Sequence, residues 1–355
     1  PGTGAIGAGS DAVLESQATQ PAAALPPATI ANGLPGATNF VPNNVNPVRT
    51  TGALGRYFDV TLAATGTTTL NSTVTIDRLT LSGAGARLNI DTTGSLTSLI
   101  DVTQTTGTMQ VNGILSTLGD YFLMTGGLNG TGTIYTPFFT SMAGVISPGE
   151  SGNAGSIGTL NFRGNVILAS GNTYLLDLGA NGVSDRISVL SNGLATQGNA
   201  NIGGNLVLNY SAATLRAGNI YTILTAENLV SGAFATPAPI SAILTPRVLQ
   251  FTSSVQLAIN AGSYRTVAGT TTVQQSYAQL FDQNRNVAAS LDSIYGPLDL
   301  QNAATIRATF DALAPRTEPL INGIATTVVD NNARFHRDRL AQYDASESHG
   351  GTIAV

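Results

Sequence analysis

The sequence has no cysteine, no lysine and no tryptophan, and it is poor in charged and aromatic side chains. Charged residues make up 10% of its 355 residues and aromatic residues 6%. Without cysteine the chain cannot form disulfides or thiolate metal sites. The net charge of −5 and the lack of any basic stripe argue against nucleic acid as a partner. No apolar run reaches the roughly 18 residues that a membrane-spanning helix needs.

Side chains that could catalyse a reaction are also scarce. A histidine acts as a general base when a nucleophile and an orienting carboxylate converge on it. Asp338 and Asp344 lie near His336 in the sequence, but the surrounding arginines favour a solvated helix face, and His349 lies in the tail. Gly149-Glu-Ser-Gly lacks the Gly-x-Ser-x-Gly spacing of a nucleophile elbow. We therefore expect no enzyme active site, and no cofactor, metal or small-molecule substrate.

Isolated aspartates are better explained by turns than by ligand binding. Asp91-Thr-Thr-Gly is one residue too long for the Asp-Thr-Gly of aspartic proteases, and we interpret it as a turn in which Gly94 takes a positive φ. Asp177, Asp185 and Arg186 stand out because charge is rare here. A calcium site requires six to eight oxygen ligands, so we expect Asp185 instead to close the preceding turn and to pair with an arginine.

The sequence does contain a long series of strand-sized apolar segments separated by Gly, Asn, Ser and Thr. Strands are predicted over residues 57–62, 74–81, 86–90, 96–102, 108–115, 132–135, 174–178, 185–189, 205–210, 220–224 and 250–259. Two strands per coil give a period of roughly twenty residues, as in a parallel β-helix. About ten coils at about 4.8 Å would form a rod of roughly 50 Å. An antiparallel sandwich uses the same strand spacing, but the series continues without a break in composition, which favours the solenoid.

Aromatic side chains occur as neighbours at strand ends. Because successive strand residues point to opposite faces, we expect one ring of each pair in the core and the other exposed. Binding of sugar or protein by the exposed rings is the alternative. The pairs are Tyr57-Phe58, Tyr121-Phe122 and Phe138-Phe139.

After residue 262 the apolar period changes to that of helices. Helices are predicted over 272–295, with Thr271 or Thr272 as N-cap and Gly296-Pro297 as the stop, and then over 301–313 and 318–342. Proline, alanine and glycine dominate the first 55 residues and indicate an extended arm. The expected organisation is therefore a linker arm over 1–55, β-helix rungs over 56–157, a C-terminal cap over 158–262, a helical junction over 263–345 and a loose tail over 346–355.

Several segments, in this order and spacing, resemble the membrane-proximal passenger region of bacterial autotransporters (type V secretion), of the sphingomonad type. They are Val145-Ile-Ser-Pro-Gly, Gly158-Thr-Leu-Asn-Phe, Ser184-Asp-Arg-Ile-Ser-Val, Gly218-Asn-Ile-Tyr-Thr-Ile-Leu-Thr-Ala and Gly232-Ala-Phe-Ala, followed by Asp311-Ala-Leu-Ala-Pro-Arg. The resemblance implies a right-handed parallel β-helix whose last rungs act as an autochaperone. It also implies export to the cell surface or medium, with an outer-membrane barrel of the same precursor as the partner, expected beyond Val355. The chain departs from the full pattern in showing neither that barrel nor an enzymatic head before residue 56.

These observations favour a non-enzymatic passenger module that serves as a stalk and as an aid to folding and secretion. Two alternatives remain open. The first is a self-associating adhesin or extracellular filament protein, because amphipathic helices can pack between chains. The second is the stalk of a subtilase-type autotransporter whose protease head lies outside this chain.

Overall fold

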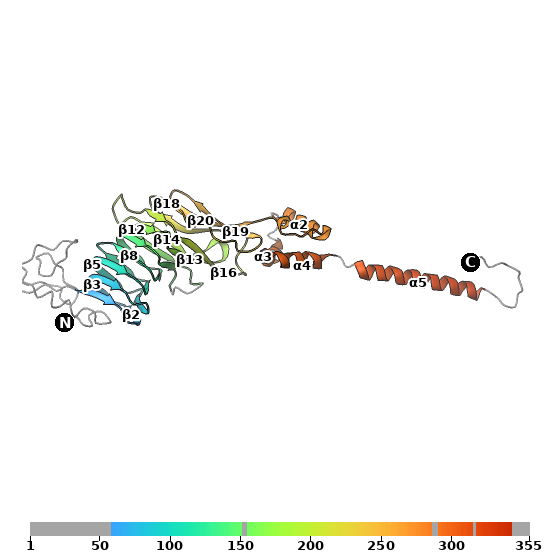
Figure 1. Cartoon of the computed structure of the whole chain (residues 1–355), viewed down its shortest axis with the longest axis horizontal. Coiled ribbons are helices and arrows are strands. Elements are labelled where there is room, and N and C mark those ends of the chain that lie inside the picture. Colours follow the sequence, from blue (N-terminus) through green and yellow to red (C-terminus); the bar gives the residue numbers. More distant parts are fainter. Residues whose placement is uncertain (1–57, 151–154, 286–289, 315–316, 343–355) are drawn as a thin grey trace, which may run out of the picture.

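The computed structural model describes residues 58–150, 155–285, 290–314 and 317–342. Within these ranges the protein is mainly β: twenty strands come first and a few helices follow. The strands form an elongated stack, and the helices lie beyond one end of it (Figure 1). The arm predicted over 1–55, Tyr57, and the tail predicted over 346–355 lie outside the described residues.

The strands belong to two sheets, one of thirteen strands and one of seven. The smaller sheet consists of β2 (Gly66–Leu70), β4 (Ala86–Ile90), β6 (Thr108–Val111), β9 (Gly127–Gly130), β11 (Val145–Pro148), β13 (Thr173–Leu178) and β16 (Asn205–Tyr210). The larger sheet consists of β1 (Asp59–Leu62), β3 (Thr73–Leu81), β5 (Ser95–Gln104), β7 (Ile114–Thr117), β8 (Tyr121–Leu123), β10 (Thr133–Ser141), β12 (Thr159–Leu168), β14 (Arg186–Leu190), β15 (Ala200–Ile202), β17 (Ile220–Ala226), β18 (Val230–Gly232), β19 (Leu244–Gln250) and β20 (Ser254–Ala261).

The chain passes from one sheet to the other and back, and each strand pairs with its counterpart from the next pass. In the smaller sheet the order β2-β4-β6-β9-β11-β13-β16 follows the sequence, and all its pairs are parallel. In the larger sheet the pairs from β1 to β17 are parallel, while β20 pairs antiparallel with both β17 and β19. This pairing excludes the antiparallel sandwich.

The register of the larger sheet shifts at two places. The first shift lies between Ile76 and Arg78 in the β3–β5 pair, and the second lies between Tyr135 and Phe138 in the β10–β12 pair. At the first shift the buried Ser98 hydroxyl lies 3.1 Å from the Asp77 carbonyl oxygen and 2.6 Å from that of Asp101, so its one O–H is shared between them. A side chain thus supplies a donor to backbone carbonyls at this irregularity, as buried backbone groups require.

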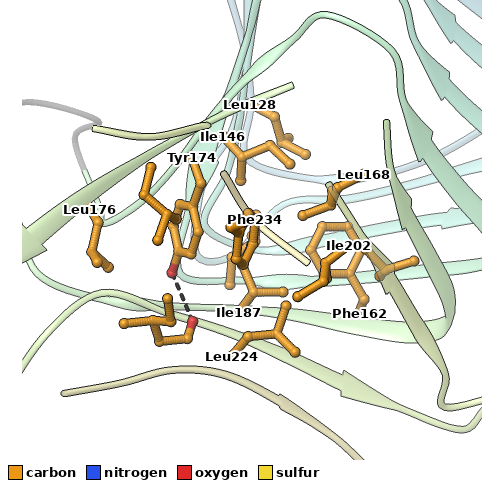
Figure 2. Close-up of a cluster of buried hydrophobic side chains, with 14 of the residues drawn as sticks. Leu128, Ile146, Phe162, Leu168, Tyr174, Leu176, Ile187, Ile202, Leu224 and Phe234 are labelled. Carbon is orange, nitrogen blue, oxygen red and sulfur yellow. Dashed lines mark hydrogen bonds between the residues drawn. The ribbon is translucent and has the colours of Figure 1, made fainter. Parts of the chain in front are cut away.

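The core lies between the sheets, where inward-facing apolar side chains stack in register. One ladder of the smaller sheet runs Leu88, Met109, Leu128, Ile146, Tyr174 and Leu206, and every member is buried. Figure 2 shows part of this core, where Leu128, Ile146 and Tyr174 of the ladder lie near Phe162, Ile187 and Leu224 of the larger sheet. Burying one such side chain stabilises the fold by roughly 1.5–3 kcal/mol.

The helices are α2 (Thr272–Asn284), α3 (Asp292–Asp299), α4 (Ala303–Leu313) and α5 (Thr317–Ala341). The predicted N-cap Thr271 is confirmed, because its hydroxyl accepts the Gln274 N–H at 3.3 Å. The first three helices pack around an aromatic cluster of Tyr264, Phe281, Tyr295 and Phe310. In contrast, α5 extends away from the rest of the protein (Figure 1), and Leu320 to Ala341 are all exposed.

Three boundaries differ from prediction because turns interrupt apolar runs. Residues 108–115 form two strands, β6 and β7, which belong to different sheets. Residues 250–259 are the end of β19, a turn and then β20, and the turn is closed by the Phe251 N–H donating to the Ser254 carbonyl at 2.8 Å. Residues 272–295 comprise α2 and the first half of α3 instead of one helix.

One further expectation was wrong. The helix does not stop at Gly296-Pro297, since α3 continues to Asp299, held by the burial of Tyr295, Leu298 and Asp299. Packing here overrides the low helix propensity of proline. The main path of the larger sheet contains ten strands, which at about 4.8 Å each correspond to roughly 50 Å.

Candidate functional site

Of the side chains considered for catalysis, the structure describes His336 and Asp338. His336 is the one histidine among the described residues, and it is exposed on α5. Its ring packs edge-on against Phe335 of the same helix, with 5.8 Å between ring centroids. Asp338 is exposed on the same helix, whereas Asp344 and His349 lie outside the described residues. That the chain is not an enzyme stays a prediction.

The Asp91 segment is a turn between β4 and β5, as predicted. The Asp91 carboxylate accepts the Thr92 N–H at 2.7 Å, and the Gly94 N–H donates to the Asp91 carbonyl at 2.8 Å. The expected positive φ at Gly94 was wrong. Glycine is required there by crowding, since a Cβ would lie 2.2 Å from the Leu70 carbonyl oxygen.

The aromatic pairs divide between core and surface as expected where both rings are described. Phe139 is fully buried while Phe138 is 44% exposed, and Tyr121 is buried while Phe122 is half-buried. Buried Tyr121 and Phe139 contact each other edge-to-face at 5.0 Å between centroids. The buried members therefore serve packing.

Asp177 and Asp185 form a buried polar site around the turn that follows β13. The Asp185 carboxylate accepts the backbone N–H groups of Gly158 and Asp177, at 2.9 and 3.0 Å. Asp177 in turn accepts the Gly155 N–H at 2.8 Å and bonds the Asn209 amide. Together they join β13 and β16 with the loop that precedes β12.

This geometry corrects one expectation and explains a perturbed carboxyl group. Asp185 closes the turn as predicted, but its carboxylate is held by backbone amides rather than by an arginine. Burial raises the pKa of Asp185 to about 7, and nearby Asp177 raises it further, against the lowering effect of the two N–H donors. Asp185 is therefore a group that titrates near neutral pH.

Two buried tyrosines link the smaller sheet to β17, the strand at which parallel pairing ends. The Tyr174 hydroxyl donates to the Ile223 carbonyl at 2.9 Å (Figure 2). Ile223 lies at the register shift between β17 and β20, so Tyr174 satisfies a carbonyl at that irregularity. From β17, the Tyr221 hydroxyl donates to the Gly179 carbonyl at 3.1 Å. The strand on which the antiparallel hairpin pairs is thus fixed to the smaller sheet.

A second enclosed polar cluster joins the strands to the helices. The Arg285 guanidinium binds both carboxylate oxygens of buried Asp299, at 2.8 and 2.9 Å. The Tyr264 hydroxyl donates to the same carboxylate at 2.6 Å. A cavity of about 570 Å³ adjoins this cluster and is also lined by the ion pair of Arg216 and Asp292. The cluster fixes α2 and α3 to the segment that follows β20.

Sequence reasoning did not single out the tyrosines or the Arg285–Asp299 pair. Tyr174 and Tyr221 occupy ordinary apolar positions of predicted strands, and only the fold shows that a carbonyl faces each hydroxyl. The rarity of charge was a usable signal for Asp299 and Arg285, as it was for Asp185.

Comparison with protein-family models gives no match, and a search of curated proteins gives none either. None of the described helices combines the length and apolar character needed to cross a membrane. Among the described residues, no three His, Asp or Glu side chains are grouped so that they could hold a metal ion.

Proposed function

We propose that the two sheets form a right-handed parallel β-helix and that this chain is a non-enzymatic passenger module, a stalk whose C-terminal end aids its own folding and secretion. The observation that supports this most directly is the change of pairing at β17. Parallel strands accumulate pass after pass, and an antiparallel hairpin then covers the last one. Right-handed crossovers are the general rule for parallel strands.

The proposed mechanism is templated stacking of successive coils. An open strand edge offers unpaired N–H and C=O groups to the next segment that arrives. The hairpin of β19 and β20 is built from contacts that are closer in sequence than those of the parallel pairs, and it pairs with β17, which Tyr174 and Tyr221 hold to β13. We propose that this end folds first, outside the cell, and gives an edge on which the preceding passes assemble. The outer-membrane barrel of the same precursor would then be its partner during export.

Deleting residues 158–259 from the full chain tests this proposal. We expect loss of the far-ultraviolet β signal and rapid proteolysis of the remaining strands, because their last edge would lack its template. Deletion of residues 317–341 is the matched control, since α5 makes no part of the core, and it should leave both readouts unchanged. A protease-resistant, β-rich product from the first deletion would refute the proposal.

A second candidate function is that of a self-associating surface protein. It is favoured by the apolar side chains that α5 exposes, among them Leu320, Val329 and Leu340, each more than half exposed. Light scattering coupled to size-exclusion chromatography over a range of concentrations would test it. A monomer at every concentration would contradict self-association and leave the stalk as the proposed function.

A further inference from the structure

The helical region presents two uncharged surfaces that lack partners among the described residues. The first is a groove of about 480 Å³ beside α4, lined by Phe281, Ile294, Pro297, Leu298 and Leu313 together with Gln301, Thr305 and Thr309. Ile294 and Leu313 are each 47% exposed there. The second is a stripe on α5 made of Leu320, Gly323, Ile324, Thr327 and Val328, which line a shallow hollow of about 370 Å³.

We propose that these two surfaces bind each other between two copies of the chain, so that each copy places its α5 in the α4 groove of the other. The partner is therefore a second copy of this protein, and the contact is an exchange of equivalent helices. The proposal goes beyond the stalk function, and it gives a surface to the alternative of self-association.

The two surfaces match in length and in spacing. The part of α5 from Leu320 to Val329 carries no charge and is about as long as α4, which has 11 residues. Aligned antiparallel, Leu313 lies opposite Leu320, Thr309 opposite Ile324 and Thr305 opposite Val328. Both sets advance by four residues, and such positions share one face of a helix. Gly323 leaves room on the α5 side for the backbones to approach.

The connection between α4 and α5 favours a second copy over the chain's own groove. Ala314, which ends α4, is extended, with φ −60° and ψ 137°. It precedes Pro315, and a residue before proline disfavours the helical conformation. In Figure 1, α5 extends away from α4 and does not lie against it. Short connections of this kind promote exchange of an element between identical chains.

Two-fold symmetry doubles the contact. A two-fold exchange forms the same helix-in-groove contact twice, and helix-in-groove docking is a common mode of recognition. Because stable interfaces bury roughly 1,200–2,000 Å² in total, the doubled contact favours a stable dimer over a single docked helix. The charged end of α5, from Asp330 onward, would extend past α4 and remain in solvent.

Cysteine substitutions test the exchange cleanly because the chain has no cysteine of its own. Mixing a Thr309→Cys chain with an Ile324→Cys chain under mild oxidation should give a disulfide-linked heterodimer. Neither chain can form that bond alone. The double variant, Thr309→Cys with Ile324→Cys, should likewise give linked dimers rather than a closed monomer. An intrachain disulfide in dilute double variant would show that α5 binds its own groove, and would overturn the proposal.

Light scattering with the full chain gives the second test. We expect twice the 36.2-kDa chain mass at high concentration, falling to one chain on dilution. Ile324→Asn and Leu313→Asn should each weaken dimerisation at least tenfold; both side chains are exposed in the monomer, so folding should not suffer. Val329→Asn, on the opposite face of α5, is the matched control and should leave it unchanged. A monomer throughout refutes the exchange, and oligomers that ignore both substitutions support self-association by another surface.

Discussion

Asp185 is a carboxylate that the fold removes from water while giving it two N–H donors. Its pKa rises to about 7 from an ordinary value of 3.8, mainly because of burial. Between about pH 4 and 7 the folded state therefore holds a proton that the unfolded chain releases. The contribution to the free energy of unfolding is fully present below pH 4 and is lost as the pH rises through 7. Buried Asp77, whose pKa burial raises to about 8, acts in the same direction.

We therefore expect the melting temperature to fall as the pH is raised from 4 to 8. Asp185→Asn should remove the part of this slope that lies between pH 4 and 7, because the amide does not titrate, and should leave the part due to Asp77. Thermal melts followed by circular dichroism at half-unit intervals would measure both. Asp120→Asn, at an exposed position, is the control and should keep the full slope. Equal slopes in all three proteins would contradict this explanation.

At the scale of one strand, the register shift between β10 and β12 falls at Gly164, and glycine is required there for two separable reasons. Gly164 has a φ of 145°, and a Cβ there would lie 1.7 Å from the Thr136 carbonyl oxygen of the neighbouring strand. Gly66 at the start of β2 has nearly the same φ, 147°, but a Cβ on that residue would meet no atom within 4 Å. The two glycines therefore have the same backbone strain, but only Gly66 has free space for a Cβ.

Alanine at each of these glycines should separate the two effects. Gly66→Ala should cost about 1–3 kcal/mol through backbone strain alone. Gly164→Ala should cost about 1–3 kcal/mol more, because β10 and β12 must move apart to admit the methyl group. Urea unfolding monitored by circular dichroism gives both values. Equal losses of stability in the two variants would show that β10 and β12 move apart at Gly164 without a measurable cost.

The same scale shows what a sequence can and cannot predict for this fold. β4 and β16 match their predicted ranges because apolar and polar residues alternate clearly between glycine and asparagine turns. β8, β15 and β18 have three residues each, too few to show any period, and they were not predicted separately. The parallel pairing was favoured only by the length of the series. The antiparallel hairpin was missed because one apolar run spans its turn.

The polar site around Asp185 could likewise be predicted only in part, because the sequence shows local patterns but not contacts between distant strands. Asp185 was recognised as a turn-closing residue because charge is rare, but its amide donors come from the loop before β12 and from β13, which only the fold brings together. Tyr174 gave no signal at all, since an aromatic residue in a strand ordinarily indicates the core. Its role depends on the Ile223 carbonyl, 49 residues away.

For the whole molecule, these contacts imply that stability is distributed very unevenly. β12, β13 and β17 carry fully buried side chains that meet between the sheets (Figure 2). By contrast, α5 is exposed from Leu320 to Ala341, and an isolated helix is only marginally stable in water. Local opening should therefore need little free energy in α5 and close to the global value in the central strands.

Hydrogen exchange followed by mass spectrometry would reveal this gradient. In dilute solution we expect amides of α5 to exchange within the shortest labelling time, while those of β12, β13 and β17 remain protected longest. Raising the protein concentration should slow exchange over residues 320–329 and along α4, where two copies would meet, and should leave residues 330–341 fast because that charged end stays in solvent. If the amides of the strands exchanged as fast as those of α5, the uneven distribution of stability would be contradicted. If a higher protein concentration did not protect α5, only the proposed binding of α5 to a second copy would be contradicted. The strands and the helices thus give independent answers within one measurement.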